Sequence, residues 1–209
     1  MTSSQVRLLT AVGAATCWGV LVLAWVAGAL YNASRGPQER TRRQRGSTAF
    51  VGAVVVLAIL VSAILRAVPA SSWRALTIQT PWVRVLGLVV LIGSTAFAVW
   101  ARVALGTMWS LAPVVKEGHQ LRTDGPYGVT RHPIYTGLLG MLLGTVLLVG
   151  LGRSVVIFPV GVVLIEIKIH VEEGLMLTTF PADYARYRRR VPQLVPGLRL
   201  LHRPHTADA

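Results

Sequence analysis

Two polar stretches lie on either side of the fourth apolar block of the chain, and the first contains the tripeptide Arg131-His132-Pro133. An Asp-Gly-Pro turn signal at 124–126 precedes it, and proline is favoured in the first turn of a helix. Arg131 and His132 are therefore expected at a helix N-terminus, at the membrane surface. Exposed backbone N–H groups and a guanidinium at such a position form a site for a carboxylate or another anion.

The alternative for this stretch is purely interfacial. Taken singly, Arg131 and His132 would anchor a helix at the lipid headgroups, and Tyr127 and Tyr135 would be interfacial belt residues. The tight order of turn, arginine, histidine, proline and tyrosine favours a binding site over separate anchors.

The second stretch begins inside the fifth apolar block and contains five ionisable residues: Glu166, Lys168, His170, Glu172 and Glu173. An unpaired charge near membrane depth is costly, so such residues are functional candidates. At about 100° per residue Glu166, His170 and Glu173 share one helix face, whereas Lys168 and Glu172 share another and are expected to pair. A salt-bridged helix end emerging into water is the simpler alternative. A water-filled cavity holding a polar ligand explains Glu166 and His170 better, because both lie deeper.

The elements that position these stretches are five apolar blocks, which qualify, some of them barely, for the roughly 20 mainly apolar residues that a membrane helix needs. The chain is 53% hydrophobic and only 14% charged, whereas soluble domains are roughly 25% charged. We therefore predict an all-α, polytopic integral membrane protein of about five transmembrane helices. The blocks are Leu8–Tyr31, Ala49–Val68, Val83–Leu105, Ile134–Leu151 and Val155–Val171.

The last two blocks are separated only by residues 150–154, which predicts a tight antiparallel helical hairpin. Its glycines permit close helix packing. Residues 180–190 predict a short cytoplasmic helix, either a lid over the site or a helix on the membrane surface. The expected organisation is N-terminal spans over 1–104, a catalytic region over 105–196 and a tail over 197–209.

The formal net charge of +13 comes from arginines that flank the apolar blocks. We expect them to meet anionic lipid headgroups, and we expect no nucleic-acid partner. Arginines concentrate at 34–47 and after residue 185, so the positive-inside rule places the N-terminus outside and the C-terminus in the cytoplasm, in the inner or plasma membrane. Cys17, the single cysteine, is expected to be a packing residue. The first apolar block exceeds the roughly 7–15 residues of a signal h-region, so it is predicted to be a span.

Common cofactor-binding patterns are absent from the sequence. It contains no Walker-type loop, no Rossmann glycine fingerprint and no cysteine or histidine spacing for zinc. No metal site is expected, and any nucleotide-like cofactor would occupy an unconventional helical site.

Two sets of residues together resemble the isoprenylcysteine carboxyl methyltransferase family, whose wider superfamily includes the membrane phospholipid methyltransferases. The first set is Gly125-Pro126-Tyr127, Arg131-His132-Pro133, Tyr135 and Gly137. The second set is Glu172-Glu173, Phe180, Tyr184, Tyr187, Val191-Pro192 and Pro196. The resemblance extends over residues 105–196.

The resemblance implies an enzyme that uses S-adenosylmethionine, bound between the cytoplasmic ends of the last helices. It implies that Arg131 meets the cofactor's carboxylate. The implied cofactor-binding residues are His119, Gln120, Leu121, Gly125, Pro126, Tyr127, Arg131, His132, Pro133, Tyr135, Glu172 and Glu173. The candidate substrate-binding residues are Trp109, Glu166, Lys168 and His170. The candidate catalytic residues are Arg131, Lys168 and Glu173.

Methyl transfer from a sulfonium is an in-line displacement, which depends on alignment more than on a strong base. A lipophilic acceptor would enter sideways between helices. Family members typically carry an arginine five residues before the second glutamate, where this chain has Lys168. Lysine keeps the charge but loses the bidentate fork. The acceptor therefore stays open between a prenylated thiol acid, a phospholipid amine and a small thiol.

Two other functions fit the same sequence. Sterol reductases use a related helical pocket and a similar Arg-His-Pro motif for NADPH, although they usually have more spans. A non-enzymatic membrane protein that retains the fold is the third reading, and the intact Arg131, His132, Glu172 and Glu173 argue against it. The oligomeric state is not predicted.

Overall fold

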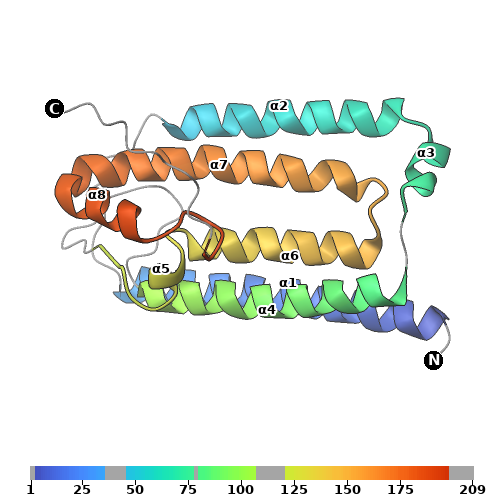
Figure 1. Cartoon of the computed structure of the whole chain (residues 1–209), viewed down its shortest axis with the longest axis horizontal. Coiled ribbons are helices and arrows are strands. Elements are labelled where there is room, and N and C mark those ends of the chain that lie inside the picture. The colour runs from blue at the N-terminus through green and yellow to red at the C-terminus, as the bar shows by residue number, and fades with distance from the viewer. Residues whose placement is uncertain (1–2, 36–45, 78–79, 107–120, 198–209) are drawn as a thin grey trace.

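The chain was analysed as a computed structural model that describes residues 3–35, 46–77, 80–106 and 121–197. All elements within these ranges are helices, which confirms the predicted all-α class. They are α1 (Ser3–Arg35), α2 (Gly46–Ala67), α3 (Ala70–Ala75), α4 (Pro81–Leu105), α5 (Pro126–Val129), α6 (Pro133–Val149), α7 (Ser154–Thr179) and α8 (Pro181–Arg190). The long helices lie side by side, with α5 and α8 at one end of the bundle and α3 at the other (Figure 1).

Three helices are long and apolar enough to cross a membrane: Gln5–Asn32, Pro81–Leu105 and Ser154–Thr179. Two further apolar helices, Val54–Ala67 and Pro133–Val149, are shorter within the described residues. Large apolar side chains such as Leu23, Val89 and Val103 are exposed on the outside of the bundle. Lipid is the solvent that such a surface requires. An integral membrane protein is thus supported, whereas the count of five spans and the membrane hairpin stay predictions.

The best-packed part of the bundle lies between α1, α4 and α6. Its buried cluster contains Cys17 and Leu21 of α1, Leu91 and Ala98 of α4, and Met141 and Leu148 of α6. Cys17 is therefore the packing residue that the sequence predicted. The indole Nε1 of Trp18 donates to Thr145 Oγ1 at 3.1 Å, which adds a polar link between α1 and α6.

Glycines bring α4 and α6 close together. A Cβ on Gly144 would lie 2.8 Å from backbone atoms of Gly87 and Leu91, and one on Gly137 would lie 2.6 Å from Ala98 Cβ. The expectation that these glycines permit close helix packing is confirmed, and for Gly137 and Gly144 the neighbouring helix is α4. Gly161 of α7 does face α6, with Leu142 as its neighbour.

Helix α7 continues to Thr179, beyond the predicted apolar block that ends at Val171. Its last turns carry Glu172 and Glu173, whose carboxylates have partners outside α7 in Tyr135 and Arg131. Two short helices, α3 and α5, were not predicted. Trp73 of α3 is buried, and its indole donates to Val68 O at 3.1 Å.

Candidate active site

The chain enters α6 through a turn that begins at Gly125. Gly125 has a φ of 57°, a conformation that glycine adopts without strain. Pro126 starts α5, and Thr130 follows it in an extended conformation, fully buried. Pro133 then occupies the first turn of α6, as predicted, with His132 at the N-cap. Arg131 and His132 thereby stand at the start of α6.

The segment after α8 covers this helix start. The backbone N–H of Arg131 donates to Pro192 O at 2.8 Å, and that of His132 donates to Gln193 O at 3.1 Å. Thr136 Oγ1 donates to Leu194 O at 2.7 Å. The N–H groups of Arg131 and His132 are therefore not available to an anion, because the chain's own carbonyls occupy them. The expected anion site of exposed N–H groups at the helix start is contradicted for these two donors.

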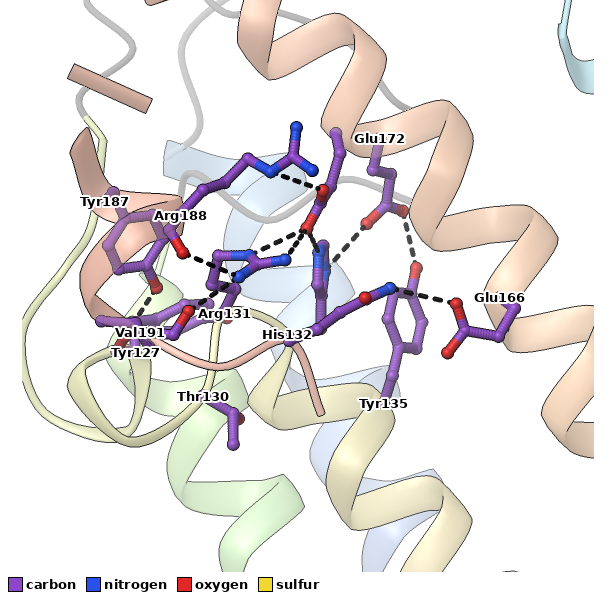
Figure 2. A network of polar contacts seen from close by, with 12 residues as sticks. Tyr127, Thr130, Arg131, His132, Tyr135, Glu166, Glu172, Tyr187, Arg188 and Val191 are labelled. Atoms are coloured by element: carbon purple, nitrogen blue, oxygen red, sulfur yellow. Dashed lines mark hydrogen bonds and ion pairs between the residues drawn. The ribbon is translucent and has the colours of Figure 1, made fainter. Parts of the chain in front are cut away.

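Glu173 of α7 is the centre of the polar network (Figure 2). Its Oε1 lies 2.9 Å from Arg131 Nε, 2.8 Å from Arg131 Nη2 and 3.3 Å from His132 Nε2. Its Oε2 lies 3.3 Å from Arg188 Nε of α8. The Arg131 and Glu173 side chains are only 9% and 11% exposed. A carboxylate so far from water is stable only when it is paired and hydrogen-bonded, as it is here.

Arg131 also holds the end of α8. Its Nη1 donates to Val191 O at 2.7 Å and to Arg188 O at 3.3 Å. A cation is favourable at a helix C-terminus, where backbone carbonyls lack partners within the helix. One guanidinium therefore joins the start of α6, the last turns of α7 and the end of α8.

Glu172 forms a second, more open cluster (Figure 2). Tyr135 donates its hydroxyl to Glu172 Oε1 at 2.6 Å, and Lys168 Nζ lies 3.5 Å from the same oxygen. The predicted Lys168–Glu172 pair is thus confirmed. The two side chains are 21% and 26% exposed. His132 stacks on Tyr135 with ring centroids 5.8 Å apart and so lies between the two clusters.

Helix α8 lies against the site through two buried tyrosines, Tyr184 and Tyr187. The Tyr187 hydroxyl donates to Tyr127 O at 2.5 Å, which joins α8 to α5. Burial raises the pKa of both tyrosines above the ordinary range, and the Glu173 carboxylate adds to the rise. Both hydroxyls therefore stay neutral at physiological pH. Of the two predicted positions for this helix, the structure has it over the polar residues.

The structure brings seven of the predicted site residues together. Tyr127, Arg131, His132, Tyr135, Lys168, Glu172 and Glu173 converge at one end of the bundle. Glu166 is exposed and accepts from Gln193 Nε2 at 3.0 Å, and His170 is exposed on α7. Leu121 and Gly125 precede α5, whereas Pro126 and Pro133 are buried. Trp109, His119 and Gln120 lie outside the described residues.

Three contributors were missed by the sequence reasoning. Arg188 was grouped with the basic tail, and no local pattern distinguishes it from its neighbours. Gln193 and the carbonyl of Val191 contribute through the path of the chain after α8, which only tertiary structure reveals. Of these three, only Val191 had a signal in the sequence, because the Val191-Pro192 pair is part of the family resemblance.

Residues 85–178 match the isoprenylcysteine carboxyl methyltransferase (ICMT) family. The matched region contains Arg131, His132, Glu172 and Glu173. The resemblance predicted from the two motif sets is thereby confirmed.

Similar curated proteins include two isoprenylcysteine O-methyltransferases and one metal-resistance protein. The chain is 35% identical over 79 residues to protein-S-isoprenylcysteine O-methyltransferase of Schizosaccharomyces pombe, covering 37% of this chain and 34% of that protein. It is 30% identical over 118 residues to protein-S-isoprenylcysteine O-methyltransferase B of Arabidopsis thaliana, covering 55% and 60%. The cobalt-zinc-cadmium resistance protein CzcN of Cupriavidus metallidurans is 30% identical over 98 residues, covering 46% and 45%. Each match thus spans less than two thirds of the relative's own length.

The fold has a counterpart among solved structures. The structure of a eukaryotic intramembrane Ras methyltransferase, ICMT, matches with a TM-score of 0.51 and 21% sequence identity. The match covers 72% of this chain and 53% of that one. At this identity the comparison establishes the shared helical architecture.

Proposed function

We propose that this chain, whose residues 85–178 match the ICMT family, is an S-adenosylmethionine-dependent methyltransferase of the membrane. The observation that carries the proposal is the convergence of Arg131 and His132 with Glu172 and Glu173 beneath α8. Two separated stretches, each typical of the family, meet at one end of an apolar bundle. By the positive-inside rule that end faces the cytoplasm.

The two clusters suit different parts of such a reaction. The Arg131 and Glu173 side chains are almost completely buried, and the donors of Arg131 already have acceptors in the protein. This cluster therefore holds the start of α6, the last turns of α7 and the end of α8 in position. A cofactor carboxylate at Arg131 would have to exchange with Glu173. The cluster of Lys168, Glu172 and Tyr135 is more open, and its ammonium, carboxylate and hydroxyl complement the charged and hydroxyl groups of S-adenosylmethionine.

When bound, S-adenosylmethionine supplies an electrophilic methyl group on a sulfonium. The chain's part is to hold the cofactor and to align an acceptor that arrives from the bilayer. A carboxylate acceptor is already ionised at pH 7, so no general base is required for it. The relatives' names favour a prenylcysteine carboxylate as the acceptor, and Lys168 would meet it as a point charge instead of a fork.

The proposal is tested by isothermal titration of the purified protein in detergent with S-adenosylhomocysteine. Saturable binding is expected, weakened in His132→Ala and Glu173→Gln variants. No binding at high micromolar concentration would refute the assignment. NADPH binding without S-adenosylhomocysteine binding would indicate a reductase instead. Incubation of membrane extracts with radiolabelled methyl donor, followed by identification of the labelled product, would then identify the acceptor.

A further inference from the structure

Among the described residues, the charged side chains at the end of the bundle opposite α8 are all positive. Five arginines lie at this end: Arg7, Arg66, Arg74, Arg84 and Arg153. Every described Asp and Glu falls between residues 124 and 183. On α7, which begins at this end, the first carboxylate is Glu166, about 20 Å along the helix from Arg153. The described residues of this end therefore offer no carboxylate to Arg66 or Arg153.

Two of these arginines line one cavity of about 520 Å³. Arg66 comes from the last turn of α2, and Arg153 immediately precedes α7. The hydroxyl-bearing Ser62 also lines the cavity, and most of the remaining wall is apolar, including Leu65 and Val68. The volume lies within the range of about 300–1,000 Å³ that is typical of small-ligand sites.

We propose that this Arg66–Arg153 cavity binds the headgroup phosphate of an anionic phospholipid. Two guanidinium groups from different elements offer charge-assisted hydrogen bonds to a phosphodiester, which arginine recognises better than lysine does. The cavity lies where two apolar helices end, which is the level of the lipid headgroups.

The surface beside the cavity distinguishes a lipid from a free phosphate. Ile64 of α2 adjoins the lining residue Leu65, and Val155 of α7 lies two residues after Arg153; these two side chains are 43% and 42% exposed. Acyl chains attached to the bound phosphate would run along these side chains. Since α2 packs on α7, the bound lipid would join the ends of the two helices.

The experiment measures thermal unfolding of the purified full chain in a neutral detergent. Phosphatidylglycerol, phosphatidylcholine with the same acyl chains, and inorganic phosphate are added at equal concentrations. Phosphatidylglycerol is expected to raise Tm by several degrees, because a ligand that binds only the folded state stabilises it. The Arg66→Gln/Arg153→Gln double variant is expected to lose most of this shift. Arg74→Gln, which removes an arginine of the same end outside the cavity, is expected to keep it.

Two outcomes would overturn the proposal. One is an equal phosphatidylglycerol shift in the double variant and the wild type. The other is a full shift with inorganic phosphate, which would mean that the site takes a free anion. If the double variant does not fold, the single variants are scored by native mass spectrometry for retained phosphatidylglycerol, and undiminished retention in both contradicts the site. S-adenosylhomocysteine binding by the same samples reports separately on the proposed enzyme activity.

Discussion

The contact between α4 and α6 and the network beneath α8 stabilise the same bundle through different interactions. The first relies on shape, since Gly87 and Gly144 let two backbones approach closely in an apolar setting. The second relies on charge, since Arg131 and Glu173 are buried as a pair with further partners. The difference teaches that α6 is fixed by close packing along its length and by a charged network at its start.

The largest expected effect is at Glu173, in the charged region. Glu173→Ala leaves the buried Arg131 guanidinium without its carboxylate, and breaking a buried pair in this way costs about 3–5 kcal/mol. We expect a large fall in Tm in detergent and loss of S-adenosylhomocysteine binding. Arg186→Gln is the control, since its partner Asp183 lies 3.9 Å away and the side chains are 59% and 68% exposed. A fall in Tm as small as the control's would mean that the network does not support the fold.

The next effect is at Gly144, in the shape-dependent region. Gly144→Ala places a Cβ 2.8 Å from backbone atoms of α4, and overpacking of this kind costs about 1–3 kcal/mol. We expect Tm to fall and the fall to be independent of salt concentration, because no charge is involved. Gly174→Ala is the matched control, since a Cβ there meets nothing within 4 Å. Equal Tm values for the two variants would contradict the close approach of α4 and α6.

A smaller effect is expected at Tyr187, where α8 meets α5. Tyr187→Phe keeps the buried ring and removes the hydroxyl that donates to Tyr127 O, at a cost of about 1 kcal/mol. Tm should fall slightly, and limited proteolysis should cut within α8 more readily. Unchanged proteolysis would show that the hydroxyl does not secure the helix.

The smallest stability effect is expected at Glu172, which is more exposed than Glu173. Glu172→Gln keeps an oxygen for the Tyr135 hydroxyl. It loses the charge that faces Lys168, a partly exposed contact worth about 0.3–0.5 kcal/mol, and the longer contact with His132 Nδ1 at 3.9 Å. If the open cluster holds the cofactor, affinity for S-adenosylhomocysteine should fall about tenfold, a loss of roughly 1.4 kcal/mol. Titration with S-adenosylhomocysteine measures the affinity, and thermal unfolding of the same sample measures the stability. Wild-type affinity would remove Glu172 from the proposed site.

Local patterns predicted much of this architecture. The apolar blocks, Pro133 at the start of α6 and the Lys168–Glu172 pair follow from hydrophobicity, the missing N–H of proline and helical spacing. The hydrogen-bond acceptors of the Arg131 and His132 N–H groups could not be predicted from local patterns, because they lie some 60 residues later in the chain. The helix that Gly137 and Gly144 meet could not be predicted either, since spacing shows that a face is small but not which helix it contacts.

The contacts of the segment at 191–194 have a consequence for how the protein is made. Arg131 and His132 are synthesised well before the carbonyls of Val191, Pro192 and Gln193 that accept from them. All the described apolar helices precede these carbonyls in the chain, so the contacts of the polar end can form only after those helices have been synthesised. Nonsense or frameshift changes just after Arg190 would therefore leave every apolar helix intact and still deprive the start of α6 of its acceptors.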